Sequence, residues 1–221
     1  MDVESKAVNK ILSSILHDTK KPFNNLKMFL TLLETKADDL QFLKNCSQSL
    51  LKDADDLFDF IRRLKEYFGP FKSSPETVIF KEIILRSFEE SKSGELSFIL
   101  EGDDRLMVSI EAKYIKHALG LLFFKSFELY KLKVLDKIKA SFKLEEKKIL
   151  LSIIFKGENI NNFLDEDKFL IPFFLKEKQG NEKDLNLSLC SKVLKEFGCL
   201  LSFYKRQDDF ELLVEIPIIS K

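Results

Sequence analysis

Apolar residues in the first 68 positions recur at alternating spacings of four and three. The first series is Leu12, Leu16, Thr19, Phe23, Leu26, Leu30 and Leu33; the second is Leu40, Leu43, Ser47, Leu50, Ala54, Leu57, Ile61, Leu64 and Phe68. Such heptad spacing predicts two long helices, each with an apolar seam suited to a supercoiled bundle. The break at residues 35–39 is short and polar, so we expect the helices to form an antiparallel hairpin.

One hairpin cannot bury both seams together with the apolar residues beside them. The flanking residues are Ile11, Ile15, Phe29, Leu51 and Phe58. Pairing two hairpins into a four-helix bundle would bury all of these positions, and we therefore predict a homodimer. The alternative is a monomer in which the flanks pack on the C-terminal half of the chain.

The pattern changes after a linker at residues 69–75, where two prolines, a glycine and two serines interrupt it. Short alternating segments predict strands at 78–80, 96–100, 106–110, 138–144, 149–155, 200–204 and 210–216, and helical patterns fall at about 81–92, 111–132 and 184–197. Strands grouped mostly in pairs favour an α+β fold. We expect a helical hairpin over residues 1–72 and a layered α/β sandwich over residues 76–221.

Composition narrows the classes of function. Lys+Arg 36 balance Asp+Glu 36, which argues against bulk affinity for nucleic acid or an anionic membrane. The three cysteines lack the C-x-x-C spacing of a zinc site, and neither a signal peptide nor a membrane-spanning segment is predicted, so we expect a cytoplasmic protein. The 7 glycines are widely spaced, which excludes phosphate-binding loops that need clustered glycines.

The two histidines differ in context. His117 lies in an amphipathic helix and is interpreted as an ordinary surface or boundary residue. His17 follows the seam residue Leu16 and so points away from the seam, on a face shared with Lys20, Lys21, Asn24 and Met28. A neutral imidazole beside cations is suited to accepting a phosphoryl group, because its nitrogen is a nucleophile and the lysines stabilise charge on the transferring oxygens.

The segment Ile15–Phe23, with the sequence ILHDTKKPF, resembles the H-box of sensor histidine kinases. Pro22 within the helix fits the kinked helix of that family's dimerisation and phosphotransfer domain. The resemblance implies that His17 is the phospho-accepting residue and that Asp18 accepts a proton during phosphorylation. Lys21 stands where phosphatase-competent kinases have Thr or Asn, a departure that argues against phosphatase activity.

The second half resembles the ATP-binding domain of the kinase and gyrase type. Residues 111–122 resemble its N-box helix, residues 169–174 its F-box, and residues 185–199 the stretch after its ATP lid. The nucleotide-binding residues are missing: Lys125 stands near the position of the magnesium-ligating asparagine, Phe155 near that of the adenine-reading aspartate, and the second glycine box, which ends at Asn186, has no glycine. The resemblance thus implies a kept fold and a lost ATP site.

An H-box joined to a broken ATP site resembles the histidine phosphotransferases built on a kinase frame, of which the ChpT type is one. This resemblance implies a two-component phosphorelay, in which His17 takes a phosphoryl group from one response-regulator receiver domain and passes it to another. Lys20, Lys21, Asn24 and Met28 would contact the receiver, and magnesium would be held by the receiver, so this chain would need no cofactor or metal. Two alternatives remain open: a non-catalytic pseudokinase that binds a kinase or a receiver, and, ranked last, an active kinase with divergent nucleotide boxes.

Overall fold

The computed structural model describes residue 20 and residues 23–32, 39–68, 71–72, 74–158, 160–164, 186–206 and 209–219. The chain divides into two compact units, Met1–Gly69 and Pro70–Lys221, and each is described by itself below. His17, Asp18 and Lys21 lie outside the described residues, as does the predicted F-box at 169–174.

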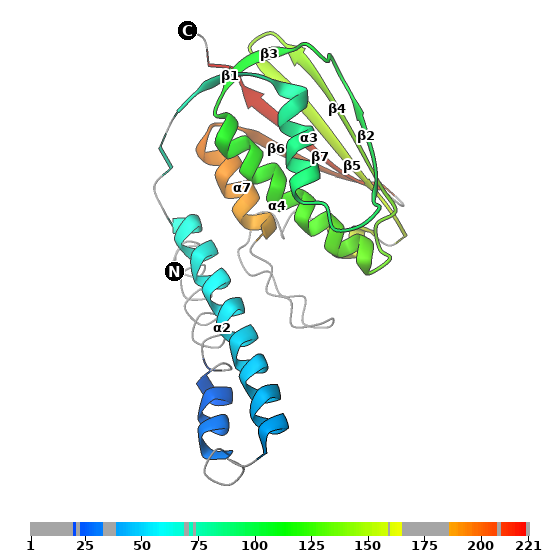
Figure 1. The fold of residues 1–221 in the computed structure, drawn as a ribbon. Helices are drawn as coiled ribbons and strands as arrows, with labels where there is room; N and C mark the ends of the chain where they lie inside the picture. Colours follow the sequence, from blue (N-terminus) through cyan, green and yellow to red (C-terminus); the bar gives the residue numbers. More distant parts are fainter. Residues whose placement is uncertain are drawn as a thin grey trace, which may run out of the picture. The chain divides into compact units, whose positions relative to one another are not determined.

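Unit 1 contains the second predicted helix and, within the described residues, part of the first. Residues 23–32 are helical, and they lie beside α2, which spans Leu40–Phe68 (Figure 1). Asp39 begins α2 as an N-cap, because its carboxylate accepts a hydrogen bond from the Phe42 amide at 2.9 Å. Asn25 Nδ2 donates to Asp53 Oδ2 at 2.5 Å, which joins the two helices side by side as the sequence predicts for a hairpin.

Many of the predicted seam and flanking residues of unit 1 are exposed in the single chain. The seam residues Phe23 and Leu40 are 63% and 80% exposed, and the flanking residue Phe58 is 72% exposed. Leu26, Leu30, Leu51 and Ile61 are exposed as well. One hairpin therefore leaves a large apolar surface uncovered, as the heptad pattern predicts.

Unit 2 is an α+β domain. Its strands are β1 (Glu76–Ile79), β2 (Ser97–Glu101), β3 (Met107–Ile110), β4 (Lys137–Glu145), β5 (Lys148–Lys156), β6 (Leu200–Lys205) and β7 (Asp209–Pro217). Its helices are α3 (Phe80–Glu90), α4 (Ala112–Lys131), the short α5 (Ile160–Phe163) and α7 (Asn186–Glu196). The seven strands and three longer helices predicted from the sequence are confirmed; α5 was not expected.

The strands form two sheets. The larger is mixed, with the order β2-β4-β5-β7-β6, in which β2 and β4 are parallel and the other pairs antiparallel. Helices α3, α4 and α7 lie on one side of it (Figure 1). Alternate residues of β4, β5 and β7 are buried, because side chains alternate between the two faces of a sheet and only one face meets the helices. In the smaller sheet, β1 pairs with β3 in antiparallel register.

The C-terminal segment joins the outer edge of the smaller sheet. The amide of Ile219 donates to the carbonyl oxygen of Ser109 in β3 at 2.9 Å, and the amide of Ile218 donates to that of Lys147 at 2.9 Å. Lys147 lies in the turn between β4 and β5. The tail therefore links the two sheets through main-chain hydrogen bonds.

Candidate functional site

The exposed face of the first helix carries three residues that the sequence analysis singled out. Lys20, Asn24 and Met28 are all exposed, and Met28 is 58% exposed. A spacing of four places them one above another on a single helical face. Asn25, next to Asn24, makes the hydrogen bond to Asp53 of α2. Lys20, Asn24 and Met28 thus form an accessible polar and apolar surface, while the neighbouring Asn25 joins the two helices.

Lys125 marks the first position of the nucleotide site implied by the family resemblance. It lies on α4 with its side chain only 8% exposed, and its Nζ is 3.0 Å from Glu128 Oε2. A magnesium ligand must offer an oxygen lone pair, whereas a lysine ammonium is a donor without one. The residue present at this position therefore does not fit a metal ion.

Phe155 marks the second position. It lies on β5 and is fully buried, paired in register with Ile138 of β4 and Phe210 of β7. The ring centroids of Phe155 and Phe210 are 6.3 Å apart. An aromatic hydrocarbon offers no hydrogen-bond acceptor to an adenine amino group, so this side chain fits the hydrophobic core and not a nucleotide base.

Gly157 is the one glycine in the first glycine box, and its surroundings explain why it is glycine. A Cβ at this position would lie 2.0 Å from the carbonyl oxygen of Val134 and 2.9 Å from the Cα of Leu135. The backbone that follows α4 packs directly against β5 here, and the Asp136 amide donates to the Lys156 carbonyl oxygen at 2.8 Å. The glycine is required by packing within unit 2 and needs no bound phosphate to account for it.

Asn186 marks the third position. It is the first residue of α7 and is buried, with 3% of its surface exposed. The three positions of the implied nucleotide site are thus occupied by the buried side chains of Lys125, Phe155 and Asn186. Among the described residues, no group of three or more His, Cys, Asp and Glu side chains could hold a metal ion.

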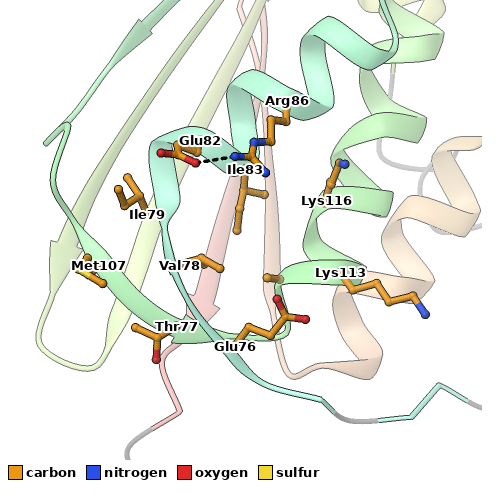
Figure 2. A pocket seen from close by; sticks show the side chains of 11 residues that line it. Glu76, Thr77, Val78, Ile79, Glu82, Ile83, Arg86, Met107, Lys113 and Lys116 are labelled. Atoms are coloured by element: carbon orange, nitrogen blue, oxygen red, sulfur yellow. Dashed lines mark hydrogen bonds and ion pairs between the residues drawn. The ribbon is translucent and has the colours of Figure 1, made fainter.

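A groove that could not be predicted from the sequence lies elsewhere on unit 2. It has a volume of about 480 Å³, and its lining comes from β1, β3, α3 and α4 (Figure 2). On its wall Arg86 pairs with Glu82 at 2.9 Å and Lys116 pairs with Glu90 at 2.6 Å, while Glu76 and Lys113 add one charge of each sign. This groove has neither the paired carboxylates nor the concentrated positive charge of a metal or phosphate site.

Comparison with known proteins places the fold. No model of a protein family matches the sequence, and no curated protein matches it either. Among solved structures, the histidine kinase AdeS of Acinetobacter baumannii is similar with a TM-score of 0.66 and 16% identity, over 92% of this chain and 98% of AdeS. The histidine kinase ThkA, in a complex with the response regulator protein TrrA, is similar with a TM-score of 0.71 and 21% identity, over 97% of this chain and 63% of ThkA.

The catalytic domain of ThkA by itself is similar with a TM-score of 0.51 and 23% identity, over 66% of this chain and 96% of that domain. The chain has a histidine-kinase-like fold. Its α+β unit with a mixed five-stranded sheet is similar to the ATPase domains of histidine kinases. No helix of the described part of the chain is long and apolar enough to cross a membrane.

Proposed function

We propose that the chain is a histidine phosphotransferase of a two-component phosphorelay that works without ATP. His17 accepts a phosphoryl group from the aspartyl phosphate of one receiver domain and passes it to the aspartate of another. The observation that carries the proposal is the pairing of an H-box sequence with Lys125, a buried ammonium paired with Glu128 at the position of the expected metal ligand.

Three further features support the loss of ATP chemistry. Phe155 is fully buried where the resemblance expects the adenine-reading aspartate. Gly157 is accounted for by its close approach to Val134 and Leu135. The second glycine box, at 182–186, contains no glycine. Phosphoryl transfer from ATP needs a metal and a close backbone approach to the phosphates, so the phosphoryl group has to come from another phosphoprotein.

The relay step balances without a cofactor on this chain. The lone pair of an unprotonated His17 ring nitrogen attacks phosphorus, an N–P bond forms, and the P–O bond to the receiver's aspartate breaks, which releases a carboxylate. Asp18 accepts the ring proton that becomes acidic in this step. A receiver would hold the magnesium, which would supply positive charge for the oxygens of the transferring group. The reverse reaction with a second receiver completes the relay.

A receiver is the partner that best matches the accessible face of the first helix. Lys20 supplies positive charge for a phosphorylated acidic site, and Asn24 and Met28 continue the same exposed face. ThkA, which is similar in fold, is complexed with a response regulator. In the helix predicted from the sequence, His17 precedes Lys20 by three residues, so a receiver seated on this face would come within reach of it.

We also propose that two hairpins pair into a four-helix bundle. The exposed apolar residues Phe23, Leu40 and Phe58 support this assembly, since burial of such side chains is the main driving force of bundle formation. The second copy would cover surface that the hairpin leaves open to water.

The decisive experiment mixes the protein with a receiver domain that carries a radiolabelled aspartyl phosphate. The wild-type chain should acquire acid-labile, alkali-stable label within minutes, and His17→Ala should acquire none. His117→Ala is the matched control, because His117 is the second of only two histidines, and it should be labelled like the wild type. If the His17→Ala variant acquired as much label as the wild type, the proposed relay through His17 would be wrong.

The two rival functions predict other results in the same assay. A non-catalytic pseudokinase would bind the receiver in a pull-down and acquire no label. An active kinase would be labelled at His17 by radiolabelled ATP with magnesium and without any receiver, and it would show heat of ATP binding in a calorimetric titration. Either result would replace the relay.

A further inference from the structure

Residues 71–75, at the start of unit 2, form a connector that leads from unit 1 to β1, and Phe71 in it packs into an aromatic cluster of unit 2. The ring of Phe71 packs edge-on against Tyr114 of α4, with centroids 5.5 Å apart and an interplanar angle of 89°. It also meets Phe197, just after α7, with a centroid distance of 6.0 Å. Tyr114 and Phe197 stack on each other at 4.5 Å and 21°. Phe71 thus packs against a ring pair formed by two helical segments far apart in sequence.

Main-chain hydrogen bonds hold the residues that follow. The amide of Lys72 donates to the Tyr114 hydroxyl oxygen at 3.1 Å, and the amide of Ser74 donates to Glu111 Oε2 at 2.7 Å. Glu111 is buried, with 6% of its surface exposed, and it directly precedes α4. A carboxylate there is favoured by the positive end of the helix dipole. Both acceptors therefore lie on or beside the first turn of α4.

The contacts can be broken without disrupting the core. Phe71 is only half-buried, and Lys72, Ser74 and Pro75 are exposed. Of residues 71, 72, 74 and 75, which the structure describes, none belongs to the larger sheet. Segments with few buried contacts open at a much smaller free-energy cost than the core does.

We propose that Phe71, Tyr114, Phe197 and Glu111 form a latch that holds the connector on unit 2, and that release of the latch extends the reach of unit 2. Freeing residues 71–75 adds five residues of chain, or about 17 Å when extended. The effective concentration of one linked unit around the other depends on the length of the free linker. The latch thus regulates the encounter between the two units.

Hydrogen exchange of the full chain tests the latch directly. The Lys72 and Ser74 amides should be protected in the wild type, and Phe71→Ala should speed their exchange at least about tenfold. Tyr114→Phe keeps the ring contacts and removes the hydroxyl acceptor, so it should speed exchange of Lys72 far more than that of Ser74. Phe124→Ala is the matched control: Phe124 is on α4 and 42% exposed, and this change should leave both amides as in the wild type.

The result that overturns the latch is equally specific. If both amides of the wild type exchange at the rate of an unstructured chain, or if Phe71→Ala leaves them unchanged, there is no latch. Amides of β5 report on folding in each variant. If Phe71→Ala unfolds unit 2, Tyr114→Phe decides: retained protection of Lys72 in that variant contradicts the proposal.

A distance measurement tests the consequence for reach. Spin labels are placed on the partly exposed Cys46 of α2 and on Glu158→Cys of unit 2, where Glu158 is exposed. The buried Cys190 and Cys199 should stay unlabelled. Diluted with excess unlabelled protein, the Phe71→Ala chain should give a broader distribution of label distances than the Phe124→Ala chain. Equal distributions would show that the connector's hold on unit 2 has no effect on reach.

Discussion

Lys125 Nζ lies 3.0 Å from Glu128 Oε2, three residues further along α4, while the lysine side chain is 8% exposed and the glutamate 41%. The pair is therefore asymmetric: the cation is buried and the anion reaches water. Removing a charge from water is costly unless a partner compensates it. The two residues should consequently respond differently to neutral replacements.

Glu128→Gln should destabilise unit 2 by about 1–2 kcal/mol, because it keeps the buried ammonium and removes the charge of the carboxylate 3.0 Å away. This destabilisation is smaller than the loss expected for a fully buried ion pair, because water already screens the charge of Glu128. Lys125→Met fills the same space with an apolar chain and should change stability by less than about 1 kcal/mol. Urea unfolding gives the free energy of unfolding of both variants. A larger loss of this free energy in Lys125→Met than in Glu128→Gln would contradict the prediction.

Gly157→Ala should be among the most destabilising single changes in the chain. Its Cβ would lie 2.0 Å from the Val134 carbonyl oxygen, so strands and loop must separate, at a cost we place at about 4 kcal/mol or more. Gly120→Ala is the matched control, since the nearest atom to its Cβ is Ser91 Oγ at 3.9 Å. In the middle of α4 that change should add about 0.5–1 kcal/mol. Thermal unfolding of the two variants should show melting temperatures shifted in opposite directions.

Stability should fall in alkaline solution partly because of two buried thiols. Burial raises the pKa of Cys190 and that of Cys199 to about 12. An unfolded thiol loses its proton near pH 8.5, so between about pH 9 and 12 unfolding releases protons and the folded state loses about 1.4 kcal/mol per pH unit for each thiol. Below pH 8 the contribution is fully present.

The measurement compares the wild type with the Cys190→Ala/Cys199→Ala variant at pH 7, 9, 10 and 11. Loss of packing shifts the variant by a constant amount, whereas only the wild type carries the thiol slope. The gap in unfolding free energy between the two proteins should therefore narrow as the pH rises. Parallel curves would mean that the thiols do not titrate differently in the two states.

The proposed bundle makes a prediction about Phe58. This residue is 72% exposed in the single chain, and Phe58→Glu would place a charge in the bundle interior at a cost of several kcal/mol. Light scattering during gel filtration should give the mass of two chains for the wild type and of one chain for the variant. Phe124→Glu, at an exposed phenylalanine of unit 2, should remain dimeric. A wild type with the mass of one chain would exclude the homodimer.

Most elements could be predicted from local pattern. The alternation that buries Ile138, Ala140 and Phe142 of β4 has a period of two, and it is visible in the sequence because one face of the sheet meets helices while the other carries polar residues. The pairing of the strands could not be predicted from local pattern. Nothing in the residues of β2 shows that it pairs in parallel with β4 and not with β3, because the choice depends on how α4 crosses between them.

The candidate site likewise has some features that could be predicted from the sequence and others that could not. Local sequence is enough to place Lys20, Asn24 and Met28 on one helical face. The contacts of Phe71 with Tyr114 and Phe197 could not be predicted, since the three residues are distant in sequence and meet only after unit 2 has folded. One sign was available: Phe71 is a large apolar residue within a linker of otherwise small and polar residues.

Gly157 has a consequence for how nucleotide sites are recognised in chains with such a fold. The backbone of Val134 and Leu135 leaves no room for a β-carbon at this position, so packing alone requires the glycine whether or not a nucleotide binds. Surveys that score such chains by their surviving glycines would count this one as evidence of activity. The informative position is Phe155, two residues earlier, where a ring in the core cannot coexist with a carboxylate that reads a base.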